Sequence, residues 1–500
     1  MIMALRSVPI PPRPSALVSS LRGLGYSPET ALADVIDNCI TAGATSIEID
    51  LTWDEELPVA AILDDGRGMD EEKLVDALCL GGDGPESERA PGDLGRFGLG
   101  MKTASLSQSR RLTVLTKPAC STMHALRLDV AVIARDGWIA EFPDPLPKHT
   151  LATKLEGMQS GTLVLWDQLD EQSGLKDLSK EAFYLRLEEI RAHIGMIFHR
   201  YIDGDASRIS IVLNGRAIKA WDPFQVSHPA TRAMPSQRIR YAGTSFTVQP
   251  FVLPHRDRFE NEAAYDAAGG PGGWAARQGF YVYRGKRLLV AGSWLGLGGS
   301  KTWTREESSR LARIQIDLPT GIDREWRIDV RKSQARPPGP LRARLTDIAA
   351  RCREAAREVF AFRGMGARVR GSEGEANLVW LASASRNGIQ YRINRDHPIV
   401  VACRMASENP RSLDAALSII ERTVPVERIW LNVSETEGAV VPVLDIAEVS
   451  ELSDKLVELG RLLPPGMSID QRVETLLHNL PGDLGALRAS VKQKLEETDG

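Results

Sequence analysis

DLGRFGLGMKTAS, residues 93–105, places three glycines, a phenylalanine and a lysine within one short stretch. Such a stretch is either a surface loop or a backbone cradle for phosphate, because glycines allow several N–H groups to turn toward one anion. A P-loop needs GxxxxGK followed by Ser or Thr, but Met101 separates Gly100 from Lys102. A dinucleotide fingerprint needs GxGxxG directly after a strand, whereas this stretch reads GxxGxG after a polar loop.

Two upstream motifs give the stretch a context. Residues 28–42 read as an amphipathic helix, on which Asp34 and Asn38 share a face roughly opposite the apolar stripe. Their oxygens suit a water-activating base and a Mg²⁺ ligand, although polar residues on the outer face of a helix are more often merely solvated. DDGRGM (64–69) follows an apolar strand, where Asp64 suits an exocyclic amine and where a tight turn is an equally good reading.

The order of these motifs is more specific than any one of them. ADVIDN (33–38), the predicted strands 46–51 and 59–63, DDGRGM, LGRFGLGMK (94–102) and SGTLV (160–164) follow one another within about 130 residues. This order resembles the GHKL ATPases, which include gyrase, heat-shock chaperone, histidine kinase and MutL types and share the Bergerat ATP-binding fold.

The resemblance implies a role for each matching residue. Asn38 would ligate Mg²⁺ between the phosphates, and Asp64 would accept a hydrogen bond from the adenine amino group. The remaining ATP-binding residues would be Gly66, Gly68, Met69, Gly95, Phe97, Gly98, Gly100, Lys102 and Thr162, with residues 80–94 as a lid. Lys102 has an alternative reading as an ordinary surface lysine.

Asp34 departs from the pattern of the family, whose ATPase branches usually carry Glu at this position. We expect Asp34 to act as the general base but to support slow turnover, because the shorter side chain must bring the water or the helix closer.

The second part of the chain is similar to the ribosomal-protein S5-like transducer half of MORC-type ATPases, most of all the prokaryotic MORC-like (paraMORC) group. The segments that carry this likeness are 193–224, 279–297 and 326–338. The likeness implies a lysine that reaches the γ-phosphate. Lys332, after a predicted strand at 326–330, is the candidate, and Lys286 is the alternative.

We therefore predict an α+β protein of several domains. They are a Bergerat α/β sandwich at 1–172, an S5-like transducer domain at 173–362, a linker at 363–374 and a mixed α/β domain of unassigned role at 375–500. In the last domain, helices are expected near 414–422, 446–463 and 470–480, and Asp396 and His397 are read as a structural turn rather than a metal site.

Composition narrows the environment and the partners. No apolar run could span a bilayer, no secretory signal is recognisable and the five cysteines form no CxxC pair, which favours the cytoplasm and no membrane contact. Residues 324–370 hold 13 Arg and Lys against 5 Asp and Glu, whereas residues 371–500 hold 13 against 20. The candidate DNA-phosphate contacts of the basic segment are Arg351, Arg353, Arg357, Arg363, Arg368 and Arg370.

Together these features predict a Mg²⁺-dependent ATPase that forms an ATP-promoted homodimeric clamp on DNA. By analogy it would serve a prokaryotic restriction or antiviral (antiphage) defence system, with a nuclease, helicase or methylase as a further partner. Two alternatives remain open: a weakly active ATP-sensing scaffold that recruits such a partner, and a chaperone-like ATPase with protein clients.

Overall fold

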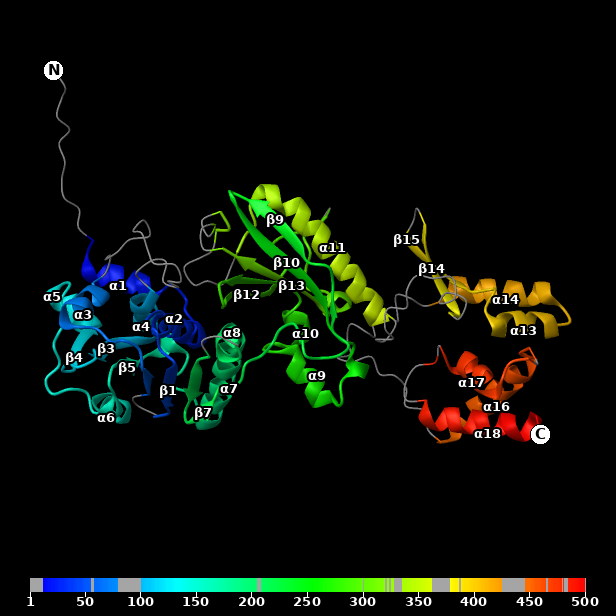
Figure 1. Ribbon diagram of the computed structural model, residues 1–500, viewed down its shortest axis with the longest axis horizontal. Helices are drawn as coiled ribbons and strands as arrows, with labels where there is room; N and C mark the ends of the chain where they lie inside the picture. The colour runs from blue at the N-terminus through cyan, green and yellow to red at the C-terminus, as the bar shows by residue number, and fades with distance from the viewer. Residues whose placement is uncertain are drawn as a thin grey trace, which may run out of the picture. The chain divides into compact units, whose positions relative to one another are not determined.

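The computed structural model of the chain describes residues 12–54, 58–79, 100–204, 208–299, 301–319, 322, 325–327, 335–361, 378–385, 388–424, 446–464, 466–478, 480 and 484–499. The chain divides into two compact units, Met1–Gly364 and Met365–Gly500 (Figure 1). No helix in the described ranges is both long enough and apolar enough to cross a membrane.

The described residues at the start of the first unit form a seven-stranded sheet with the order β4-β3-β5-β2-β1-β6-β7. Its strands are β1 (Ser46–Thr52), β2 (Val59–Asp64), β3 (Ser109–Lys117), β4 (His124–Asp129), β5 (Gly161–Leu169), β6 (Ser210–Leu213) and β7 (Arg216–Ala217). Neighbouring strands are antiparallel except for the parallel pair β1 and β6. The predicted strands 46–51 and 59–63 pair as the expected hairpin.

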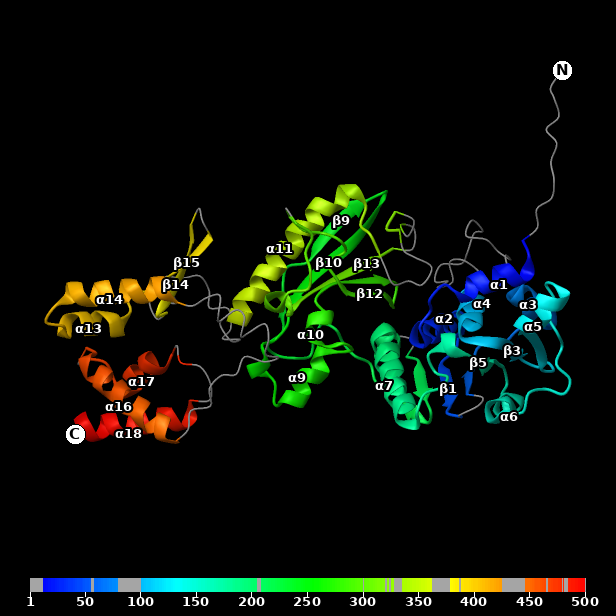
Figure 2. The same ribbon diagram turned by 180° about the vertical axis from the view of Figure 1, so that it is seen from behind.

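Helices cover both faces of this sheet (Figures 1 and 2). They are α1 (Pro14–Arg22), α2 (Pro28–Thr41), α3 (Glu71–Leu78), α4 (Gly100–Gln108), α5 (Val130–Asp136), α6 (Thr150–Gly157), α7 (Lys180–Ile197) and α8 (His199–Ile202), with a 3-10 turn at Glu171–Ser173. Successive side chains of a strand point to opposite faces. Accordingly, Ala60 and Ile62 of β2 join the large core with α2 and α4, whereas Ala61 and Leu63 join a smaller core with α6. A sheet with helices packed against both faces agrees with the predicted Bergerat α/β sandwich.

The helix α2 begins and ends where its sequence indicates. Ser27 and Thr30 form a capping box, Pro28 occupies the first turn, and Gly43 follows the last turn with a φ of +80°. The predicted helix 28–42 is therefore confirmed. The sheet also takes in β6 and β7, which lie beyond the predicted domain boundary at residue 172, because β6 pairs with β1 in parallel.

A second sheet of six strands, in the described part of the first unit, has the order β12-β11-β13-β10-β8, with β9 also paired to β10. The strands are β8 (Arg232–Ala233), β9 (Gln237–Tyr241), β10 (Thr244–Val252), β11 (Gly279–Arg284), β12 (Arg287–Ser293) and β13 (Ala312–Leu318). Its helices are α9 (Glu262–Gly269), α10 (Gly273–Ala276) and α11 (Gly339–Ala361), with 3-10 turns at Arg256–Arg258 and Glu307–Ser309. The strand expected at 326–330 is not seen in its described part, because Glu325–Arg327 form a turn whose Trp326 is buried in the second core.

The two sheets of the first unit share a hydrophobic core. Tyr281, Tyr283 and Leu288 of the second sheet pack in the same cluster as the buried side chains of α2 and α7. The β11–β12 hairpin therefore packs into the same core as α2 and α7.

The second unit combines a hairpin with helices around a separate core. Its described elements are β14 (Trp380–Ser385), β15 (Gly388–Ile393), α13 (Pro398–Ala406), α14 (Pro410–Thr423), α16 (Ile446–Leu462), α17 (Ile469–Leu477) and α18 (Gly485–Asp499). The three predicted helices correspond to α14, α16 and α17. His397 is buried and its Nδ1 accepts from the Ile399 N–H at the start of α13, in agreement with a structural turn.

Asn214 provides a test of how β6 is held beside β1. Its amide donates to the Leu51 carbonyl over 2.9 Å and accepts from the Leu51 N–H over 2.8 Å. We expect Asn214→Ala to lower the free energy of unfolding by about 2 kcal/mol, since two partly buried backbone groups lose a partner. Urea unfolding measures this loss. Asn214→Asp keeps only the acceptor, so its free energy of unfolding should lie between those of the wild type and Asn214→Ala. Equal stability of all three proteins would contradict this account.

Candidate functional site

The helix α2 carries the acidic and amide side chains that the sequence singles out. Asp34 is only 4% exposed, and its Oδ2 accepts from the Tyr26 hydroxyl over 3.1 Å. The alternative reading of Asp34 as a solvated residue on an outer face does not hold, because α4 packs on that side of α2. A Cβ atom placed on Gly100, the first residue of α4, would lie 3.8 Å from Oδ2 of Asp34.

Asn38 lies one helical turn after Asp34 and is exposed. Its Nδ2 donates to the backbone carbonyl of Asp34 over 2.9 Å. Because the amide nitrogen is used in this way, the amide oxygen is the atom suited to a cation. Mg²⁺ commonly takes one or two protein oxygens together with phosphate oxygens and water. The described residues contain no group of three or more His, Cys, Asp or Glu side chains that could hold a metal ion.

Asp64 ends β2 and is 3% exposed. Its Oδ1 accepts from the Gly66 N–H over 2.8 Å, and a Cβ atom on Gly66 would lie 2.8 Å from that oxygen. Burial raises the pKa of Asp64 to about 6, although the hydrogen bonds from Gly66 and from the Cys39 thiol lower it in part. A buried carboxylate of this kind is poised to accept a hydrogen bond from a neutral donor.

Three strands bring Asp64 together with two threonines. Asp64 of β2 pairs with Thr162 of β5, and Thr162 pairs with Thr116 of β3. The Oγ1 atoms of the two threonines are 3.0 Å apart, and Thr116 Oγ1 also accepts from the Met69 N–H over 2.9 Å. Thr162 therefore lies between Asp64 and Thr116 in the sheet. Thr116 was not predicted, since a threonine inside an ordinary strand pattern carries no signal of its own.

Gly68 brings the turn after β2 against β3. Its φ is +66°, and a Cβ atom at this position would lie only 2.2 Å from the Lys117 carbonyl oxygen. No side chain fits at this approach. The turn from Gly66 to Met69 therefore lies directly beside the row formed by Asp64, Thr162 and Thr116.

Lys102 in the first turn of α4 is 3% exposed, and its Nζ donates to the Cys79 carbonyl over 2.5 Å. Burial lowers the pKa of Lys102. The reading of Lys102 as a surface lysine is therefore wrong, and its ammonium links α4 to the end of α3. Gly95, Phe97, Gly98 and the predicted lid lie outside the described residues.

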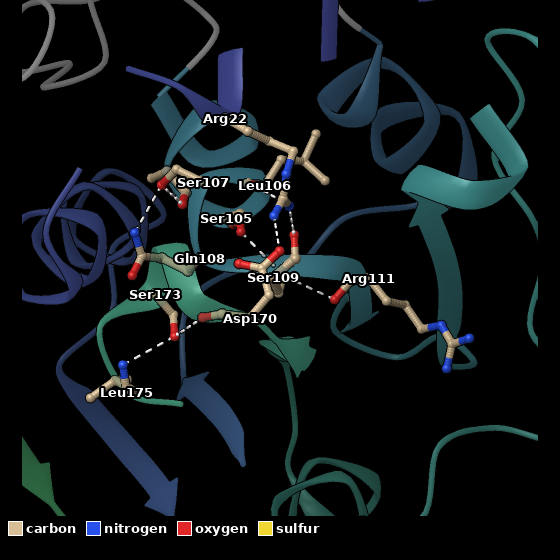
Figure 3. Close-up of polar contacts among 11 residues, drawn as sticks. Arg22, Ser105, Leu106, Ser107, Gln108, Ser109, Arg111, Asp170, Ser173 and Leu175 are labelled. Carbon is tan, nitrogen blue, oxygen red and sulfur yellow. Dashed lines mark hydrogen bonds and ion pairs between the residues drawn. The ribbon is translucent and has the colours of Figure 1, made fainter. Parts of the chain in front are cut away.

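The opposite end of α4 is anchored by Arg22, as Figure 3 shows. The guanidinium donates to the carbonyls of Leu106 and Ser109 over 2.6 Å each and pairs with Asp170. Gln108 donates to the Tyr26 carbonyl over 3.2 Å. A cation at the C-terminus of a helix is favourable, so α4 is held in place with its N-terminus beside Asp34.

The predicted DNA contacts that the structure describes do not form one exposed cluster. Arg353 is 4% exposed, its guanidinium lies 4.6 Å and 4.8 Å from the rings of Trp294 and Trp303, and it pairs with Glu306. Its predicted DNA contact is therefore wrong for this conformation, since its charge is buried and paired. Arg357 shares Glu306 but is 51% exposed, and Arg351 is exposed.

Most of the remaining predicted cations lie outside the residues that the structure describes. Lys332, Arg363, Arg368 and Arg370 lie outside the described residues. Lys286 lies in the β11–β12 turn, with its Nζ 5.8 Å from the centre of the Tyr201 ring. The next residue, Arg287, makes a buried contact with Asp37 of α2 that the sequence did not indicate, since the two residues are far apart in the chain.

Comparisons with known proteins agree with this geometry. Residues 26–162 match the family described as "Histidine kinase-, DNA gyrase B-, and HSP90-like ATPase". The range runs from Tyr26 to Thr162 and contains the side chains described above around α2, β2 and the start of α4. Residues 26–162 are therefore a domain of the GHKL ATPase superfamily.

A stretch of 90 residues is 30% identical to ATPase morc-1 of Caenorhabditis elegans. The match covers 18% of this chain and 10% of that relative. It supports a MORC-like character for the ATPase domain.

The raised pKa of Asp64 predicts a pH dependence of stability. A carboxyl whose pKa is 3.8 when unfolded and about 6 when folded binds more protons in the native state. The contribution of Asp64 to stability should therefore fall by about 3 kcal/mol as the pH rises from about 4 to about 6, and Asp64→Asn should remove this contribution. The measurement is urea unfolding of both proteins across this range.

Asp65→Asn is the matched control. Although partial burial opposes the effect, hydrogen bonds from Ser46 and Thr45 lower the pKa of Asp65 overall. Removing this carboxyl should change the pH dependence in the opposite sense. Parallel stability curves for wild type and Asp64→Asn would show that Asp64 is not a buried, easily protonated acid.

Proposed function

We propose that this chain binds Mg²⁺-ATP and hydrolyses it at the site formed by α2, β2 and the N-terminus of α4. The observation that carries the proposal is the buried carboxylate of Asp34, held by Tyr26 at the first residue of α4 and one turn from Asn38. The N-terminus of a helix favours phosphate. The proposed base and the proposed cation ligand would therefore lie close to the bound phosphates.

Adenine recognition would fall to Asp64. Its carboxylate can accept from an exocyclic amine while the Gly66 N–H holds its Oδ1. Thr162 lies beside it in the next strand, and the close approach at Gly68 leaves the base facing backbone rather than side chains. A guanine would present a carbonyl instead of an amine at this place, which disfavours it.

Hydrolysis would use Asp34 as the general base toward an attacking water. Tyr26 donates to one carboxylate oxygen and so orients the group. Mg²⁺, held by the Asn38 amide oxygen and the phosphates, would offset the charge that develops during the reaction. Turnover is proposed to be slow, because the short Asp side chain has little reach beyond its packed position.

We also propose that the ATPase works in the cytoplasm as an ATP-promoted homodimer that clamps DNA in a defence system. The basic composition of residues 324–370 and the exposure of Arg351 and Arg357 support DNA as the load. The MORC-like match supports the wider analogy. The scaffold alternative differs from this proposal because it would barely hydrolyse ATP. The chaperone-like alternative differs because it would act on protein clients and not on DNA.

Asp34→Asn tests the catalytic assignment. Because the amide cannot take a proton from water, we expect kcat for phosphate release to fall by about 100-fold or more, with ATP affinity changed little. Asp129→Asn is the control, since Asp129 is also buried but lies on β4, pairs with Arg111 and lies outside the proposed site. Equal background rates in wild type and Asp34→Asn, with ATP still bound, would support the ATP-sensing scaffold instead.

Replacing both Arg351 and Arg357 by Ala tests the DNA load. We expect weaker binding to duplex DNA and a shallower dependence of affinity on salt, because two phosphate contacts are lost. Replacing Arg135 at the end of α5 and Arg208 just before β6, which are 70% and 75% exposed, should change little. The absence of DNA binding by the wild type at low salt would favour the chaperone-like alternative.

A further inference from the structure

A buried ion pair connects the β11–β12 hairpin of the second sheet to α2. The Nε atom of Arg287 lies 2.8 Å from Oδ1 of Asp37, and the two side chains are only 5% and 2% exposed. The residues are 250 positions apart in the chain. The pair joins α2 to the second sheet.

The surroundings of Arg287 hold it in one orientation. Its Nη1 donates to the Leu288 carbonyl over 2.6 Å, and its guanidinium carbon lies 4.7 Å from the centre of the Phe198 ring. His193 also lies close, but burial and the charge of Arg287 lower its pKa to about 3, so the imidazole is neutral. A charge buried in this way depends on its partner far more than an exposed charge does.

Asp37 lies on the helix between the two functional residues. Asn38 is the next residue, and Asp34 is almost one turn earlier on the same helix. An α-helix moves as a nearly rigid element, so a shift of α2 at Asp37 also shifts the amide oxygen of Asn38 and the carboxylate of Asp34. A displacement of about 1 Å is enough to change a reaction rate on the order of 100-fold.

We propose that Arg287 is a positioning residue through which the second sheet sets the place of α2 in the nucleotide site. A movement of the β11–β12 hairpin is carried to Asp34 and Asn38 by the Arg287–Asp37 pair. Coupling of this kind is reciprocal, so nucleotide bound at α2 also changes the hairpin. The effect on ATP rests on the proposed function, whereas the mechanical link between Arg287 and α2 does not.

The experiment compares the full-length wild type with Arg287→Gln, Arg287→Lys and Arg186→Gln. Arg186 pairs with Glu29 at the N-terminal end of α2 over 2.6 Å but belongs to α7 and not to the second sheet. It therefore controls for the loss of an ion pair on the same helix. Hydrogen exchange is followed in peptides of α2 (Pro28–Thr41), of the hairpin (Gly279–Ser293) and of β5 (Gly161–Leu169).

Without nucleotide, hydrogen exchange in the second half of α2 should be about tenfold faster in Arg287→Gln than in the wild type, and exchange in β5 should be unchanged. The exchange rate of Arg287→Lys in α2 should lie between those of Arg287→Gln and the wild type. Arg186→Gln should leave the second half of α2 as in the wild type. Unchanged exchange of α2 in Arg287→Gln, or an equal increase in Arg186→Gln, would overturn the proposal. If Arg287→Gln unfolds, Arg287→Lys decides the matter by the same criterion.

A non-hydrolysable ATP analogue supplies the second readout. It should slow exchange of the hairpin in the wild type and in Arg186→Gln but not in Arg287→Gln, and kcat of Arg287→Gln should fall about tenfold. A merely structural role would leave the response of the hairpin to nucleotide intact in Arg287→Gln. If the analogue does not bind to the wild type, the proposed function fails, and exchange without nucleotide still decides whether Arg287 positions α2.

Discussion

The burial of α2 is the constraint on which the rest of the first unit depends. Asp34 and Asp37 are 4% and 1% exposed, so each carboxylate needs a defined partner within the protein. Tyr26 donates to Asp34 from the chain just before the helix, and Arg287 pairs with Asp37 from the second sheet. The two buried carboxylates of α2 thereby require Tyr26 and Arg287 as neighbours.

The site places stability and binding in opposition. A carboxylate buried at the end of β2 lowers the stability of the fold near neutral pH, as the raised pKa of Asp64 shows. In the proposed function, the same burial would exclude water that competes with the adenine amine for Asp64. Close approaches at Gly66 and Gly68 likewise leave no room for side chains and so keep backbone beside the row of Asp64, Thr162 and Thr116. The burial that lowers the stability of the fold would therefore also restrict which ligands the proposed site accepts.

Much of the fold and of the site could be predicted from local patterns. The helix at 28–42 and the hairpin of 46–51 and 59–63 follow from periodicity and capping, and the structure confirms them. The pairing of β6 with β1 could not be predicted in this way, because a parallel partner distant in the chain leaves no mark on its neighbours. The same holds for Arg353, which reads as a surface cation but is enclosed by Trp294, Trp303 and Glu306.

The sequence by itself determined which residue types stand at the ends of β2 and α2 and at the start of α4, because motif order is a property of the chain. It thereby singled out Asp34, Asn38, Asp64 and Thr162 as the predicted site residues. Only the tertiary structure decided that Asp34 is buried, that Lys102 is tied to Cys79 and that Arg287 reaches Asp37. The physical reason is that burial and ion pairing depend on what packs against a side chain, and those neighbours come from distant parts of the chain.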